Sequence, residues 1–284
     1  MTTGGGATRR IGAIGQRIRD DYLGRDRMEE YRGLLRSAQD GGYRLVSLAE
    51  FREGIRDPDD ERWLALRHDV DIVDVEGNHA FHRIERELGA HATFYFRRST
   101  APAHARLIAW LLEDGFEVGY HYEEAATYAK RSRAHDATDL ERLRPAIEAA
   151  FRRNTDAFRR RWNAELRSAA GHGDWINRQL GIRNGDFVTP RVLADAGLDF
   201  EAYDDSILGP GSTYVSDVAT PPALWASDLS LAAALSAGAP RIVLLTHERQ
   251  WHTGRLANLR ADTHRLFEAF EYRLPRVLPL SASR

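Results

Sequence analysis

Residues 64–74 read Leu-Ala-Leu-Arg-His-Asp-Val-Asp-Ile-Val-Asp, and in this stretch an apolar segment gives way abruptly to charge. The segment from Trp63 to His68 has the apolar character of a buried strand. In parallel α/β sheets, the loops at the carboxyl ends of the strands carry the chemistry. The stretch therefore predicts a core strand over Trp63–His68, with functional side chains at its carboxyl end.

Two carboxylates, Asp69 and Asp71, follow this strand at a spacing of two residues, so in an extended chain they point the same way. They would repel each other unless a cation or a proton lies between them. The alternative is that they cap the helix expected to begin near Asp74. Because Arg67 and His68 belong to the same cluster, we interpret it as a metal site.

Composition narrows the class of protein. The chain has 284 residues, of which 43% are hydrophobic and 29% charged, and this length and composition suit one large soluble α/β domain. The net charge of −2 gives no indication of nucleic-acid binding. There is no cysteine, so any metal site must be built from His, Asp and Glu. We expect residues 1–12 to be disordered and residues 13–284 to form a single domain.

Location and assembly are the least defined properties. Residues 1–10 lack the apolar run of a secretory signal, and no segment has the length of an apolar membrane span. A cytoplasmic location is therefore the expectation. The sequence indicates no oligomeric state.

Strand and helix patterns alternate along the chain, which is typical of a mostly parallel sheet covered by helices. The residues between 204 and 230 are rich in Gly, Pro, Ser and Asp and predict an extended loop over the mouth of the sheet. The predicted strands are 43–46, 63–68, 92–96, 116–121, 166–170, 199–203 and 242–246. The predicted helices are 27–39, 47–51, 74–88, 103–112, 138–162, 189–196 and 255–272.

Metal-type and acid–base-type residues recur where predicted strands end. Besides Asp69 and Asp71, they are His121 and Glu123 after the third core strand, His172 after the fourth, and His247 after the last. In a parallel barrel these ends converge on one face. His68 points away from Asp69 on an ideal strand and is expected to be structural. The remaining histidines are expected at surfaces or on polar helix faces: His79, His82, His91, His104, His135, His252 and His264.

With these residues in view, the sequence resembles the polysaccharide deacetylase family, the NodB-homology domain of carbohydrate esterases, over roughly residues 60–275. Four segments carry the resemblance: Arg67-His68-Asp69-Val70-Asp71, Ala92-Thr93-Phe94-Tyr95-Phe96, Gly115–Glu123, and Leu245-Thr246-His247 with Trp251 four residues on. The resemblance implies a distorted (β/α) barrel of about seven strands. It also implies a divalent metal, usually zinc, and hydrolysis of an N-acetyl or O-acetyl group on a sugar.

The resemblance also implies roles for individual residues. Asp69 matches the catalytic base, Asp71 a metal-binding aspartate, His121 the first metal histidine and His247 the general acid. Val70 separates two aspartates that are adjacent in the family, so the roles of Asp69 and Asp71 could be exchanged.

The third metal ligand is less defined. The family's second metal histidine falls at a position occupied here by Ala125, so a different residue must supply the third ligand. We prefer His172, because Gly171 and Gly173 flank it and let the backbone approach the site. Glu123 is the alternative, since it shares a strand face with His121.

These residues suit metal-assisted hydrolysis, in which a carboxylate accepts a proton from water and a histidine donates one to the leaving group. Tyr122 and Trp251 are expected to contact the substrate. Tyr120, Tyr203 and Trp225 are further aromatic residues near the rim that could stack on a sugar ring, whereas Tyr95 is expected in the core. The predicted function is removal of an acetyl group from an acetylated sugar or glycan precursor. Two alternatives remain: an amidohydrolase acting on a non-sugar amide, and a carbohydrate-binding pseudoenzyme that has lost full metal ligation.

Overall fold

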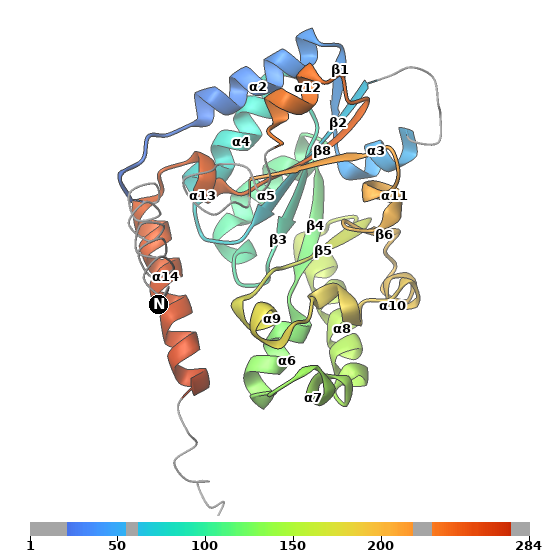
Figure 1. Ribbon diagram of the computed structural model, residues 1–284, viewed down its shortest axis with the longest axis vertical. Helices are drawn as coiled ribbons and strands as arrows, with labels where there is room; N and C mark the ends of the chain where they lie inside the picture. Colours follow the sequence, from blue (N-terminus) through green and yellow to red (C-terminus); the bar gives the residue numbers. More distant parts are fainter. Residues whose placement is uncertain (1–21, 55–61, 218–228, 274–284) are drawn as a thin grey trace, which may run out of the picture.

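The computed structural model describes residues 22–54, 62–217 and 229–273, so the predicted disorder of residues 1–12 lies outside the described part of the chain. Figure 1 shows the arrangement, a curled sheet with helices around it. The strands are β1 (Tyr43–Val46), β2 (Arg62–Val70), β3 (Thr93–Phe96), β4 (Glu117–Tyr122), β5 (Ser168–Gly171), β6 (Phe200–Glu201), β7 (Thr213–Ser216) and β8 (Arg241–Thr246).

Every pairing between these strands is parallel. Seven strands follow the order β6-β5-β4-β3-β2-β8-β7, and β1 pairs with the first half of β2, beside β3 on the second half. The sheet curls into a half-barrel whose end strands, β6 and β7, are not paired with each other in this order. The predicted distorted (β/α) barrel is therefore confirmed as a fold class.

Helices fill the connections between strands. The α-helices are α2 (Met28–Asp40), α3 (Leu48–Gly54), α4 (Val75–Glu87), α5 (Ala105–Glu113), α6 (Glu124–Ser132), α7 (Ala137–Glu141), α8 (Arg144–Trp162), α9 (Trp175–Leu180), α10 (Pro190–Asp195), α11 (Asp205–Leu208), α12 (Leu231–Ser236), α13 (Glu248–Trp251) and α14 (Arg255–Arg273). Two 3₁₀ turns, η1 (Ala101–His104) and η2 (Asn184–Phe187), complete the set. Among the helices of the described residues, none combines the length and apolar character needed to cross a lipid bilayer.

The alternation of side chains along β2 separates two apolar layers. Leu64 and Leu66 pack outward into the large cluster beneath the helices, whereas Trp63 and Ala65 pack inward with Tyr95. Residues at odd positions of β2 therefore face the inside of the half-barrel, as a period of two requires. That alternation sends Arg67 and Asp69 inward and His68 outward, where it contacts Phe81 and Phe94.

One glycine is required by this inner packing. A Cβ on Gly119 of β4 would lie 2.3 Å from the ring of Tyr95, and the Tyr95 hydroxyl is fixed by a 2.7 Å hydrogen bond with Ser168. Only glycine leaves room for the Tyr95 ring between the strands. The filled interior below this ring leaves the carboxyl ends of the strands as the place for chemistry.

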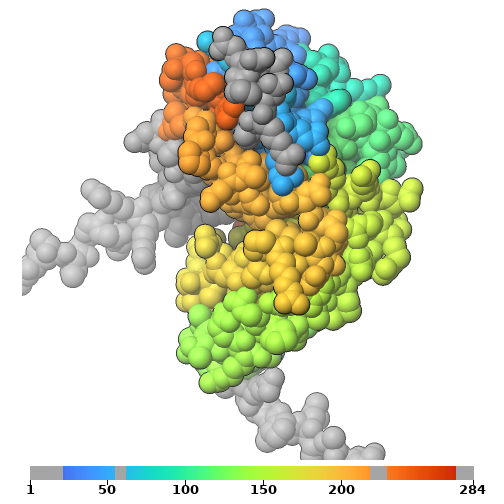
Figure 2. All heavy atoms as spheres, turned by 90° about the vertical axis from the view of Figure 1, so that its right-hand side faces the viewer, coloured from blue at the N-terminus to red at the C-terminus, as the bar shows by residue number. Residues whose placement is uncertain are grey.

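Several predicted boundaries were wrong. The predicted loop over 204–230 contains α11 and β7, although residues 218–228 lie outside the described part. On the face seen in Figure 2, this segment, in gold and orange, lies between α3, in blue, and the yellow-green helical layer. The α6 helix was not predicted, and α3 extends to Gly54 instead of ending at Phe51. The predicted helix over 138–162 is divided into α7 and α8, and Pro145 is the second residue of α8.

Two of the histidines expected at surfaces are buried. His82 is 3% exposed and shares a 2.8 Å contact with Asp114, and His104 is 1% exposed, with its Nδ1 2.9 Å from the carbonyl oxygen of Thr100. Both lie on the sheet-facing side of their helical segments with a polar partner in reach. His82 and His104 therefore belong to the packing of the outer helical layer and lie outside the cluster of predicted site residues.

Candidate functional site

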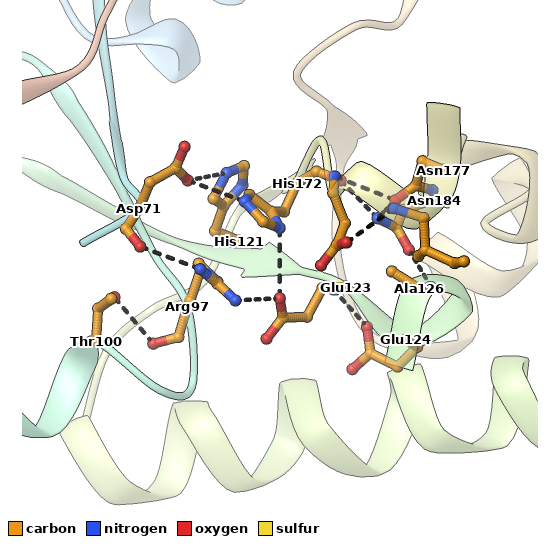
Figure 3. Close-up of polar contacts among 12 residues, drawn as sticks. Asp71, Arg97, Thr100, His121, Glu123, Glu124, Ala126, His172, Asn177 and Asn184 are labelled. Atoms are coloured by element: carbon orange, nitrogen blue, oxygen red, sulfur yellow. Dashed lines mark hydrogen bonds and ion pairs between the residues drawn. The ribbon is translucent and has the colours of Figure 1, made fainter. Parts of the chain in front are cut away.

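The carboxyl ends of β2, β4, β5 and β8 bring the predicted site residues together around Asp71. The Asp71 Oδ1 atom is 3.2 Å from His121 Nε2 and 3.5 Å from His172 Nε2, and the Asp71 Oδ2 atom is 3.9 Å from His247 Nε2. Figure 3 shows both His121 and His172 turned toward this carboxylate. Segments more than 170 residues apart in sequence thus meet at one carboxylate, because parallel strands end on the same face of the sheet.

Asp69 is held by a neighbour on its own strand. Arg67 donates two hydrogen bonds of 2.8 Å, from Nε and Nη2, to the two Asp69 oxygens, and both side chains are buried. Burial acts to raise the pKa of Asp69, but the Arg67 guanidinium outweighs it and the net pKa is lowered. Asp69 is therefore an ionised, oriented carboxylate, 3.5 Å from His121 Nε2.

The orientation of His121 is fixed by the backbone. Its Nδ1 lies 2.9 Å from the carbonyl oxygen of Ala170 and must donate a proton to it. In the neutral imidazole this leaves Nε2 as the nitrogen with a lone pair, and Nε2 is the atom that faces Asp69 and Asp71. This arrangement is what a metal-binding histidine requires, since a hydrogen bond at one ring nitrogen presents the other.

Several polar atoms at the centre of the site are buried and lack a hydrogen-bond partner. They are Asp71 Oδ1 and both ring nitrogens of His172. Burial, and next the Arg97 guanidinium, lower the pKa of His172, so its imidazole is neutral near pH 7 and offers a lone pair. Unsatisfied acceptors of this kind are costly when buried. A divalent cation between Asp71, His121 and His172 would satisfy them, so these residues fit a metal.

Glu123 and Arg97 contact Asp71 and His172 and help to fix their positions. Arg97 Nη2 donates a 2.6 Å hydrogen bond to Glu123 Oε2, and its Nη1 donates a 3.1 Å hydrogen bond to the Asp71 carbonyl oxygen. Glu123 Oε2 also lies 3.3 Å from His172 Nδ1. Burial acts to raise the pKa of Glu123, but His172 and Arg97 together hold it far below its usual range. Glu123 is thus an ionised group that faces the side of His172 opposite Asp71.

A second set of metal-type residues shares His172. One ligand atom each from Glu123, His172 and Asp174 lie within 4.8 Å of one another. However, Asp174 caps α9 and pairs with Lys130 at 2.8 Å, while Arg97 neutralises Glu123. Both carboxylates of this set already have a cation, whereas Asp71 Oδ1 has no hydrogen-bond partner among the described residues.

His247 is positioned by a carboxylate that the sequence analysis missed. Asp217, directly after β7, lies 2.7 Å from His247 Nδ1 and accepts hydrogen bonds from the His247 backbone N–H and from Trp251 Nε1. Burial opposes the charged form of His247, but Asp217, Asp71 and Asp69 outweigh it and raise the pKa of His247 to about 10. His247 is therefore protonated near neutral pH and can donate a proton from Nε2.

Glu248, the residue after His247, is a further buried acid beside the site. Its Oε1 accepts a 3.0 Å hydrogen bond from the backbone N–H of Ile72, and its Oε2 has no hydrogen-bond partner. Burial, and next the Asp71 carboxylate, raise the pKa of Glu248 well above its usual value. Burial beside Asp71 therefore favours the protonated, uncharged form of Glu248 more than it is favoured in an exposed glutamate.

The aromatic residues predicted to contact substrate lie elsewhere. Tyr122 and Trp251 are each 1% exposed; Tyr122 packs against Phe151 in the outer layer, and Trp251 holds Asp217. Neither side chain is therefore exposed enough to contact a substrate. Tyr203 is 43% exposed, and its ring lies 4.3 Å from the Arg67 guanidinium carbon, close to the pair that orients Asp69. Among the described aromatic residues that were expected near the rim, it is the one best placed to meet a ligand; Trp225 lies outside the described residues.

Ala125, where the family resemblance expected a second metal histidine, is buried in α6 within an apolar cluster. His172 is the second histidine beside Asp71. Gly171, before it, has the Tyr122 hydroxyl 3.2 Å from where a Cβ would stand, but a Cβ on Gly173 would meet nothing within 4 Å. Of the two glycines that flank His172, only Gly171 therefore lies where a side chain would be crowded.

Two cavities lie away from this cluster. One, of about 870 Å³, lies against α4 and α5 and is lined by residues that include His79, His82, Arg83 and Trp110. The other, of about 180 Å³, lies beside α11 and includes Arg52 and Ser206 in its lining. Neither lining includes a residue of the Asp71 cluster.

Comparison with protein-family models gave no match for this sequence, and a search of curated proteins likewise found none.

Proposed function

We propose that this protein is a divalent-metal-dependent hydrolase that removes an acetyl group from an N- or O-acetylated sugar or glycan precursor. The observation that carries the proposal is the set of charges around Asp71. The Asp71 carboxylate faces the Nε2 atoms of His121 and His172, an ionised Asp69 lies beside them, and a protonated His247 lies across from them.

Asp71, His121 and His172 would hold the metal. The bound cation, most simply Zn²⁺, would supply Lewis acidity toward the acyl carbonyl, a contribution of several kcal/mol. Asp69 is the residue placed to accept a proton from an attacking water, because Arg67 fixes its orientation and keeps it ionised. His247 is placed to donate a proton to the leaving nitrogen or oxygen, because Asp217 keeps it charged.

Tyr203 is the residue that supports a sugar as the substrate. Tyr203 offers an exposed aromatic face next to Arg67 and Asp69, and such faces stack against the apolar side of a sugar ring. A metal-dependent amidohydrolase on a non-sugar amide would use the same acid and base. The two functions therefore differ in what Tyr203 contacts.

An acetate-release assay tests the function. The protein, stripped with chelator and reloaded with Zn²⁺, is expected to release acetate from N-acetylglucosamine oligomers or from O-acetylated xylo-oligosaccharides, and not without metal. Acetate released only from N-acetyl amino acids would identify an amidohydrolase. Glycan binding without any acetate release from metal-loaded protein would identify a binding protein.

The third ligand is tested by paired metal titrations. We expect His172→Ala to lose most metal affinity, because it removes a donor atom. Glu123→Gln should weaken binding only about 10–100-fold, the usual effect of a group that orients a ligand. Asp174→Asn keeps an N-capping side chain and is the matched control, with affinity unchanged.

Three results would contradict this assignment. Normal affinity in His172→Ala with a large loss in Glu123→Gln would make Glu123 the ligand. A large loss in Asp174→Asn would move the metal to the set formed by Glu123, His172 and Asp174. Normal affinity in both His172→Ala and Glu123→Gln would place the metal elsewhere.

A further inference from the structure

A buried carboxylate, Glu201, connects two strand ends that border the Asp71 cluster. It is the last residue of β6 and is 9% exposed. Its Oε1 atom accepts a 2.8 Å hydrogen bond from the backbone N–H of Gly171, and its Oε2 atom accepts a 2.6 Å hydrogen bond from the backbone N–H of Tyr203. The Tyr122 hydroxyl donates a third hydrogen bond, of 3.1 Å, to Oε1. One side chain therefore fixes the backbone at the ends of two neighbouring strands, β5 and β6.

The end of β6 explains why a side chain takes this place. β6 is the end strand of the sheet, beside β5, and its register with β5 stops at Ala169 opposite Glu201 (Figure 1). The chain then turns toward α11, and the backbone N–H of Asp204 bonds back to the Glu201 carbonyl oxygen at 3.0 Å. The N–H of Gly171 thus lies past the last residue pair of the register. The Glu201 carboxylate replaces a backbone carbonyl as its acceptor.

The two backbone groups held by Glu201 belong to the two parts of the proposed site. Gly171 directly precedes His172, whose Nε2 lies 3.5 Å from Asp71 Oδ1. Tyr203 is the exposed aromatic residue proposed to meet the sugar. A single carboxylate thus sets the position of a proposed metal ligand and of a proposed substrate contact.

His172 has two further backbone contacts, which limit how far it can move without Glu201. Its N–H donates a 2.8 Å hydrogen bond to the Tyr122 carbonyl oxygen, and its own carbonyl oxygen accepts one of 2.5 Å from Asn184 Nδ2. Loss of the Glu201 acceptor should therefore loosen the His172 imidazole without detaching it. The expected effect on metal affinity is that of a group that orients a ligand, about 10–100-fold.

We propose that Glu201 is a positioning residue that fixes the metal ligand His172 and the substrate-contact residue Tyr203 relative to each other. It acts through the backbone of its neighbours and touches neither metal nor substrate. This positioning role rests on the function proposed for the Asp71 cluster.

Zinc titration of Glu201→Gln tests the proposal. The variant turns one carboxylate oxygen into an NH₂ group, which cannot accept from a backbone N–H, so Zn²⁺ affinity should fall about 10–100-fold. The matched control is Glu117→Gln. Glu117 also accepts three hydrogen bonds, from Ser168, Thr93 and Ala49, but at the opposite ends of the strands. Burial raises the pKa of both carboxyls. Glu117→Gln should lose comparable stability in urea unfolding and bind Zn²⁺ as wild type does.

Kinetics at saturating Zn²⁺ test the connection to Tyr203. Tyr203→Ala should raise KM for an acetylated oligosaccharide about 2–10-fold, the size of one aromatic contact. It keeps its backbone N–H, so its Zn²⁺ affinity should match that of wild type. Glu201→Gln should show both effects, a higher KM and weaker Zn²⁺ binding, while kcat at full metal loading is kept. Glu201→Asp, which keeps the charge but has a shorter reach, should lose Zn²⁺ affinity in the same direction and replaces the glutamine variant if that variant does not fold.

The outcomes separate this proposal from the proposed function. If wild type binds Zn²⁺ and Glu201→Gln binds it equally tightly, the positioning role is overturned and the hydrolase function stands. An equal loss of affinity in Glu117→Gln would also overturn it, because the effect would then follow stability alone. A wild-type protein that binds no Zn²⁺ would overturn the proposed function and the positioning role together.

Discussion

Asp71→Ala is expected to abolish stoichiometric metal binding and leave the fold intact. The Asp71 carboxylate approaches three histidines, yet its Oδ1 atom makes no hydrogen bond within the described structure, so its removal costs the fold no hydrogen bond at that atom. The backbone of Asp71, which accepts from Arg97, is unchanged. His121→Ala should behave in the same way, because it removes the lone pair that faces Asp71.

Metal content after exhaustive dialysis, together with thermal unfolding with and without Zn²⁺, measures this effect. A ligand at about 100 times its Kd stabilises the native state by about 2.7 kcal/mol, and this stabilisation should vanish in both variants. The matched control for His121→Ala is His68→Ala, a buried histidine on the outward face of β2 that contacts Glu85 and Thr246. It should lose stability but keep its metal. One equivalent of metal in Asp71→Ala would refute the assignment.

Asp69→Asn is expected to keep the metal and lose about 10²–10⁴-fold in hydrolysis, the usual contribution of a general base. The variant has a second cost, because it leaves the buried Arg67 guanidinium without a countercharge. Breaking a buried pair in this way typically costs about 3–5 kcal/mol. Urea unfolding must therefore accompany the kinetics, so that lost activity is not mistaken for lost structure.

The double variant Arg67→Gln/Asp69→Asn separates these two effects. It removes both charges and leaves two amide side chains that can pair, so most of the stability should return while hydrolysis stays low. If Asp69→Asn loses its metal and Asp71→Asn keeps it, the two aspartates have exchanged roles. Activity near wild type in a folded, metal-loaded Asp69→Asn would exclude Asp69 as the base.

The alternation of strand and helix and the residues at the strand ends could be predicted because both depend on local pattern. β2 is a long apolar run that ends in charge, and the barrel brings such ends together whatever the loops do. The prediction that Tyr122 contacts the substrate was wrong, although the alternation of side chains along a strand could have excluded it. If His121 faces the inside of the half-barrel, the next residue on β4 must face outward.

Other parts of the site depend on contacts that no local pattern reveals. β7 is a short strand within a Gly- and Pro-rich segment and pairs only with β8. Its register, Ser216 opposite Leu245, is what carries Asp217 to His247. Arg97 likewise follows β3 as an ordinary charged residue, and its function as a support for Glu123 and Asp71 follows only from the neighbouring positions of β2, β3 and β4.

The pairing of β2 with β8 has a consequence for how the chain is made. β2 lies between β3 and β8, and its six-residue register with β8, from Trp63 opposite Arg241 to His68 opposite Thr246, joins an early segment to a late one. At ribosomal speeds of about 5–20 residues per second, β2 emerges on the order of ten seconds or more before its partner. During that interval one edge of β2, whose first half is largely apolar, lacks its β8 neighbour. Until β8 has left the ribosome, this edge of β2 is open to pairing with other chains, and the cluster around Asp71 is completed only after that.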